Sequence, residues 1–274
     1  MRRTTLTSLF VALTAIGVSL AFATTSVATS SLPTLTLAVT PHTITVGGQM
    51  VSGAVRIATT VSGEKEDNPG LVLLKPGVTP QQFAAVVSKL GKNTPVDAID
   101  PYGTIVYGSA DAPAGKTTVG YADLPAGTYI ALNNGNGHAV FTVTQSAAPA
   151  AMPRPGATVK AIEFGFRGAD VLHEGEMVRW YNAGYLVHMV VYGRVPSVAA
   201  AKKAEAALLA GNLQGAEKLT LAHGTFVELL SSGQSQESVI DQPPGVYVIL
   251  CLMNTEDGRL HSQLGMFRTI RIVG

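Results

Sequence analysis

The chain has 274 residues, with 19 Lys and Arg against 18 Asp and Glu and a formal net charge of +1. This balance leaves no basic field for nucleic acid and no polybasic patch for a membrane surface, so we expect neither as a partner. The 29 glycines and 15 prolines fit a β-rich protein with many tight turns.

The N-terminus has the pattern of a secretory signal. Arg2 and Arg3 precede an apolar stretch over residues 9–23, which ends in Ala21-Phe22-Ala23. A charged start, a short apolar core and small residues at its end are the parts of a signal peptide. We therefore predict a signal peptide over residues 1–23, a periplasmic or secreted mature protein, and no membrane span after signal cleavage.

The remainder of the chain contains an internal repeat. Residues 124–133 (LPAGTYIALN) match residues 242–251 (QPPGVYVILC), which places Asn133 opposite Cys251, and two shorter pairs upstream follow the same order. A Ser/Ala/Pro stretch over 145–155 lies between the halves. We predict a tandem duplication with one domain over 33–146, a boundary near Ala150 and a second domain over 154–274.

Each half contains short runs of β-branched and aromatic residues bounded by Gly and Pro, which predicts an all-β class. An Ala-, Leu-, Lys- and Glu-rich stretch predicts one inserted helix over 197–213. In the second half the predicted strands are 158–164, 177–181, 189–192, 236–240, 246–250 and 266–273. On this reading Tyr247, Ile249 and Cys251 share one strand face.

Cys251 is the only cysteine, so it cannot form a disulfide within the chain. It closes an apolar run ten residues before His261 and fifteen before Met266. A thiolate, two imidazoles and a distant thioether are the ligands of a blue-copper centre. His188 is the candidate for the second imidazole, and the turn at Asp257-Gly258 can fold the intervening loop back on itself.

The second half resembles the cupredoxins over about residues 158–274. The carriers of this resemblance are His188 after a strand and an Asn-containing turn, Cys251, and the run from His261 to Met266 with Gly265 before Met266. The resemblance implies two tandem cupredoxin-like Greek-key β-sandwiches with short helical insertions. It also implies one type 1 copper ion, with His188, Cys251 and His261 as equatorial ligands and Met266 as the axial ligand.

The first half resembles a degenerate domain of the same kind, because Asn133 replaces the cysteine. In the second half Leu250 and Leu252 flank Cys251, where copper oxidases and nitrite reductases of this family carry a histidine that leads to a second copper centre. We therefore expect no catalytic residues and no enzyme. We expect an electron carrier that docks transiently with a redox partner protein through Leu186, Leu260 and Leu264. The alternative is a non-redox binding or copper-delivery protein, with or without metal.

Overall fold

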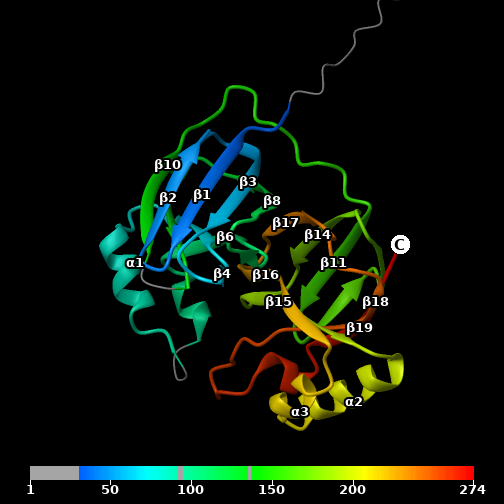
Figure 1. Ribbon diagram of the computed structural model, residues 1–274. Helices are drawn as coiled ribbons and strands as arrows, with labels where there is room; N and C mark the ends of the chain where they lie inside the picture. The colour runs from blue at the N-terminus through cyan, green and yellow to red at the C-terminus, as the bar shows by residue number, and fades with distance from the viewer. Residues whose placement is uncertain (1–30, 92–94, 135–136) are drawn as a thin grey trace, which may run out of the picture. The chain divides into compact units, whose positions relative to one another are not determined.

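Mostly antiparallel β-strands build the computed structural model, which describes residues 31–91, 95–134 and 137–274 (Figure 1). The predicted all-β class, with β-sandwiches and few helices, is confirmed. The predicted signal peptide over 1–23 lies outside the described residues. None of the described helices is both long and apolar enough to cross a membrane.

The largest sheet runs through both halves of the chain. In spatial order its strands are β12 (Gly165–Gly168), β11 (Ala157–Ile162), β14 (Met177–Asn182), β17 (Ser235–Val239), β8 (Thr117–Leu124), β3 (Gly53–Val61), β1 (Thr34–Thr40) and β2 (Thr43–Gly48). The halves meet where β17 pairs with β8, with Gln236 opposite Ala122. The predicted boundary near Ala150 therefore stays a prediction, because one sheet continues across both predicted domains.

Each half of this sheet packs against a smaller sheet, and the two cores are separate hydrophobic clusters. The N-terminal small sheet contains β10 (His138–Val143), β9 (Gly127–Leu132), β5 (Gly70–Leu74) and β6 (Gly103–Gly108). The C-terminal one contains β13 (Val171–His173), β19 (Phe267–Val273), β18 (Gly245–Leu250), β15 (His188–Val195) and β16 (Ala222–Leu230). A two-stranded pair joins β4 (Glu66–Asp67) to β7 (Ala112–Pro113).

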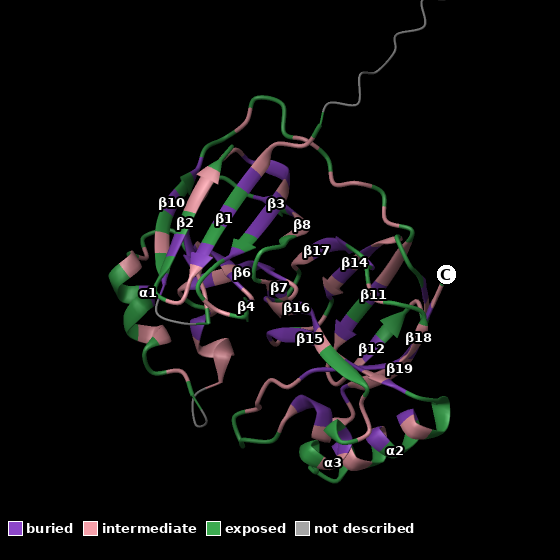
Figure 2. Cartoon of the chain, in the orientation of Figure 1, coloured by how far each residue is buried: buried purple, intermediate pink, exposed green. Residues whose placement is uncertain are grey.

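Alternation of side chains along the strands produces both cores. In β1 the buried residues are Leu35, Leu37 and Val39, with exposed residues between them (Figure 2). Successive side chains of a strand point to opposite faces, so this pattern buries one face and solvates the other. In the C-terminal core Trp180 stacks on Phe226 at 4.8 Å between ring centroids.

Two helices cover the outer face of β18, where one was predicted over 197–213. They are α2 (Val198–Leu209) and α3 (Leu213–Glu217), and the chain between them passes through Gly211 at φ +71°. This left-handed conformation suits glycine and ends the first helix. Asn212 then caps the second one, because its side chain accepts from the N–H of Gly215. The first half carries α1 (Pro80–Val87) and the short 3-10 helix η1 (Val96–Ile99).

Three strands of the C-terminal half were not predicted: β12, β13 and β16. The sequence of β16 begins Ala222-His223-Gly224, which are weak strand formers. It is a strand because it pairs along β15 in the sheet. Several predicted boundaries also differ: β11 ends at Ile162 rather than at 164, β15 covers His188–Val195 rather than 189–192, and β19 begins after Met266.

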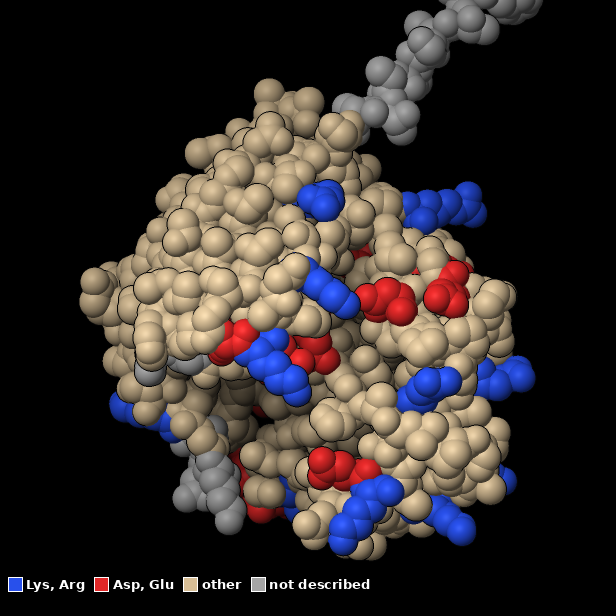
Figure 3. Space-filling view, in the orientation of Figure 1, with Lys and Arg blue, Asp and Glu red and all other residues tan. Residues whose placement is uncertain are grey.

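Side chains tie the two halves together where β6 and β16 lie close. Gln236 accepts from the N–H of Gly108 and donates to its carbonyl, both at 2.9 Å. Burial, together with the carboxylates of Asp111 and Asp67 in the other half, raises the pKa of Glu228 to about 7. On the surface, charges of both signs are interspersed over the face shown in Figure 3.

Candidate metal centre

The site lies at one end of the C-terminal sandwich, where β15 begins and β18 ends. His188 is the first residue of β15, and Cys251 directly follows β18. His261 begins the short 3-10 helix η2 (His261–Leu264). The loop from Cys251 to His261 folds back as predicted. The N–H of His261 donates to the carbonyl of Met253 at 2.8 Å, and Gly258 adopts φ +81°.

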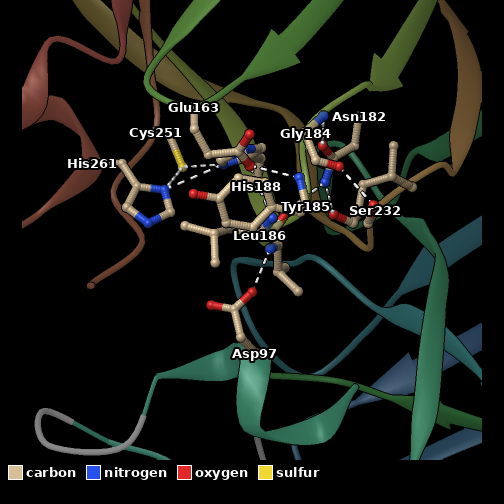
Figure 4. Close-up of polar contacts among 12 residues, drawn as sticks. Asp97, Glu163, Asn182, Gly184, Tyr185, Leu186, His188, Ser232, Cys251 and His261 are labelled. Atoms are coloured by element: carbon tan, nitrogen blue, oxygen red, sulfur yellow. Dashed lines mark hydrogen bonds and ion pairs between the residues drawn. The ribbon is translucent and has the colours of Figure 1, made fainter. Parts of the chain in front are cut away.

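Three of the four predicted ligands meet at this point (Figure 4). The Nδ1 atoms of His188 and His261 lie 3.2 Å apart, and the Sγ of Cys251 lies 3.9 Å from the first and 3.4 Å from the second. These are the only three His, Cys, Asp or Glu residues that gather in this way in the described part of the chain. The structure therefore brings together an imidazole, a thiol and a second imidazole that are far apart in sequence.

Met266, the fourth predicted ligand, is fully buried in the same hydrophobic cluster as Cys251. Its backbone fixes the loop, since its carbonyl accepts from the N–H of Cys251 at 3.1 Å and its N–H donates to the carbonyl of His261 at 3.0 Å. The assignment of its sulfur as an axial ligand stays a prediction.

Cys251 is surrounded by apolar side chains and has no exposed surface. Burial raises the pKa of its thiol to about 12. The N–H of Met189 donates to Sγ at 3.5 Å, and this bond lowers the pKa in part. A thiolate at this position needs a compensating positive charge nearby, because desolvation strongly disfavours an isolated anion.

The imidazole of His261 is also buried, and burial together with the proximity of His188 lowers its pKa to about 4. Its Nε2 atom has no hydrogen-bond partner. Phe164, which is partly exposed, covers the ring at 4.9 Å between centroids. The predicted apolar residues Leu186, Leu260 and Leu264 are partly exposed, but the imidazole itself is shielded from solvent.

Two carboxylates that sequence reasoning missed also contact this region. Glu163 accepts from His188 Nε2 at 3.0 Å. Asp97, in η1 of the N-terminal half, accepts from the N–H of Val187 at 2.5 Å (Figure 4). Burial raises the pKa of Asp97, and the nearby Glu163 carboxylate adds to this. The first half therefore supports the backbone next to His188.

The donor set fits a copper ion. A point equidistant from the three donor atoms lies about 2 Å from each, close to the usual bond lengths from a first-row metal ion to imidazole nitrogen and thiolate sulfur. Mixed thiolate and imidazole donors suit copper in both oxidation states. The buried group supports a copper-binding protein.

Neither family models nor characterised relatives match this sequence. Among solved structures, the chain is similar to reduced auracyanin from Roseiflexus castenholzii, with 21% identity over 43% of this chain and 95% of that one and a TM-score of 0.26. A multi-copper oxidase from Pseudomonas thermotolerans shows 10% identity over 88% and 67%, with a TM-score of 0.22. Copper nitrite reductase from Nitrosomonas europaea shows 12% identity over 88% and 92%, with a TM-score of 0.23. At such scores the metal interpretation depends on the side chains alone.

Proposed function

We propose that this protein is an exported one-electron carrier with a single type 1 copper centre. His188, Cys251 and His261 would hold the ion, with Met266 as a fourth ligand. The observation that supports the proposal is the convergence of two Nδ1 atoms and one Sγ around a common point in a buried site. Bound copper supplies the couple between Cu(I) and Cu(II).

The protein holds the donor side chains in fixed positions and excludes water from them. His188 and Cys251 are fixed at the ends of paired strands β15 and β18, and the loop to His261 is closed by backbone hydrogen bonds. Donors held by a packed scaffold rearrange little when the charge of the ion changes, which favours fast electron transfer. The apolar cluster around Cys251 excludes water from the sulfur.

A carrier is preferred to an enzyme because the chain neighbours of Cys251 are Leu250 and Leu252. A second copper centre reached through the ligand cysteine needs a histidine at one of these positions. The electrons then come from and go to a redox partner protein, which docks transiently at the partly exposed residues Leu186, Leu260 and Leu264. A periplasmic or secreted location follows from the predicted signal peptide.

The test is to add one equivalent of Cu(II) to the mature wild-type chain and record the visible spectrum. We expect an intense thiolate-to-copper absorption and its reversible bleaching by one electron equivalent of a mild reductant. Copper binding without this absorption, or no binding at all, contradicts the proposal.

One observation favours a second function, copper binding for delivery without electron transfer. The imidazole of His261 is fully buried, so no ligand edge is exposed for direct electron exchange. Stopped-flow exchange with a small inorganic redox complex separates the two functions. A carrier exchanges electrons within milliseconds to seconds, whereas a delivery protein exchanges them slowly and gives up Cu(I) to a soluble chelator.

A further inference from the structure

Glu163 is a charged side chain that contacts a predicted ligand directly. It lies in the turn between β11 and β12, 25 residues before His188. Its Oε1 atom accepts three hydrogen bonds, from the N–H of Tyr185 at 2.7 Å, the N–H of Leu186 at 2.9 Å and Nε2 of His188 at 3.0 Å. One oxygen therefore holds both the loop that leads to His188 and the imidazole itself (Figure 4).

The contact selects one tautomer of His188. A carboxylate can only accept, so Nε2 of the neutral imidazole carries the proton. The lone pair then lies on Nδ1, which faces Cys251 and His261.

The contact also places a negative charge one imidazole ring away from the donor triangle. The Glu163 side chain is 13% exposed and that of His188 is 1% exposed, so water screens this charge only weakly. A carboxylate bonded to a ligand imidazole makes the imidazole a stronger donor. Both effects stabilise the more highly charged state of a bound ion.

We propose that Glu163 is a positioning residue for the copper centre, which fixes His188 as an Nδ1 ligand and lowers the reduction potential by favouring Cu(II) over Cu(I). The inference rests on the proposed copper function and names the residue that regulates that site. Any electron taken up by a bound ion would come from the redox partner, and Glu163 would act only through its hydrogen bonds and its charge.

The sharpest variant is Glu163→Gln, because the amide oxygen can accept the same three hydrogen bonds while the charge is removed. Glu256→Gln is the matched control, since Glu256 is an exposed carboxylate on the loop between Cys251 and His261. It removes one charge near the site without touching a donor residue.

We expect all three copper-loaded proteins to keep the visible absorption. A redox titration should give a higher potential for Glu163→Gln than for the wild type and an unchanged one for Glu256→Gln. An unchanged or lower potential for Glu163→Gln, or an equal rise for Glu256→Gln, overturns the charge effect.

A metal-free measurement tests the positioning effect separately. Long-range ¹H–¹⁵N NMR of the histidine rings should show His188 protonated at Nε2 in the wild type and in Glu163→Gln. In Glu163→Ala, which removes the acceptor, both tautomers should be populated. A wild-type His188 protonated at Nδ1 overturns the inference, and this result does not depend on copper. Absence of the visible absorption in the wild type instead contradicts the proposed function, so the two failures are distinguishable.

Discussion

The two halves of the chain differ at equivalent positions of their β-sandwiches, the end of β9 in the first half and the end of β18 in the second. In both, a tyrosine hydroxyl donates to a proline carbonyl four residues upstream, Tyr129 to Pro125 at 2.8 Å and Tyr247 to Pro243 at 2.6 Å. Both strands continue with consecutive buried apolar residues, Tyr129 to Ala131 in β9 and Tyr247 to Leu250 in β18. They differ at the residue that follows the strand, which is Asn133 in the first half and Cys251 in the second.

Asn133 closes a turn with its own side chain. Its Nδ2 donates to the carbonyl of Thr40 and its Oδ1 accepts from the N–H of Gly137, both at 2.8 Å. Cys251 makes no such closure, and its sulfur faces two imidazoles. One sandwich corner thus satisfies its polar groups internally, whereas the other leaves three donors converging on one point. Similar strand ends therefore carry a converging His-Cys-His group in one half and a turn closed by an asparagine side chain in the other.

The largest expected effect comes from removing the sulfur. Cys251→Ser should abolish the visible absorption and weaken Cu(II) binding by at least about 100-fold, because a ligand is lost rather than one of its supporting contacts. Asn133→Ser is the matched control at the corresponding position of the first half and should leave copper binding unchanged. Isothermal titration with Cu(II) measures both, and tight binding by Cys251→Ser would contradict the assignment.

A second prediction concerns the junction between the halves and gives a dependence on pH. The pKa of Glu228 in the folded protein is raised to about 7, above the ordinary value of 4.5 for a glutamate. Its protonated form therefore contributes stability that is full below about pH 4.5 and is lost as the pH rises through 7. The shift corresponds to at most about 3 kcal/mol.

Glu228→Gln should remove this decline and make the protein more stable than the wild type at pH 8, as measured by chemical denaturation between pH 5 and 8. Glu217→Gln, at an exposed helix end, is the control. Parallel pH profiles for the wild type and Glu228→Gln would show that Glu228 ionises freely at the junction.

A third prediction tests the structural use of Asn133. Asn133→Ala removes two side-chain hydrogen bonds and should lower the free energy of unfolding by about 1–3 kcal/mol. Asn134→Ala, at the exposed neighbouring position, should cost less than about 0.5 kcal/mol. Denaturation midpoints of the metal-free proteins provide the comparison, and equal losses in the two variants would contradict the closing function of Asn133.

The smallest effect is expected at Asp97, through which the first half supports the metal corner of the second. Asp97→Ala leaves the N–H of Val187 without its acceptor and should cost about 1 kcal/mol and speed the release of bound copper. Asp97→Asn retains an acceptor oxygen and should behave like the wild type. The measurement is the rate of copper release to a chelator. Identical rates in all three proteins would contradict a supporting role of Asp97, and so of the first half, at the site.

Local patterns were enough to predict the all-β class and to select His188, Cys251 and His261, which the structure brings together. The three residues could be selected because cysteine and histidine are rare in this chain and because Cys251 and His261 lie on one loop. Strand β16 was missed because its first residues favour no strand and its pairing with β15 determines its conformation. The helix predicted over 197–213 is present as α2, but it ends at Leu209 because Gly211 adopts a left-handed conformation, and the separate helix α3 was not predicted.

The supporting carboxylates could not be found in this way. Glu163 is separated from His188 by 25 residues and Asp97 from Val187 by 90, and neither lies in a motif. Their proximity depends on how the β11–β12 turn and η1 approach the loop before β15, which is a property of the folded chain. The continuous sheet through β17 and β8 is likewise a long-range pairing that no local pattern indicates.

The most direct measurement is X-ray absorption at the copper edge on the metal-loaded wild-type protein. We predict one sulfur and two imidazole nitrogens in the close coordination shell, with the sulfur contribution lost in Cys251→Ser. A shell of nitrogen and oxygen alone in the wild type would show that copper binds elsewhere and would contradict the assignment of His188, Cys251 and His261 as its ligands.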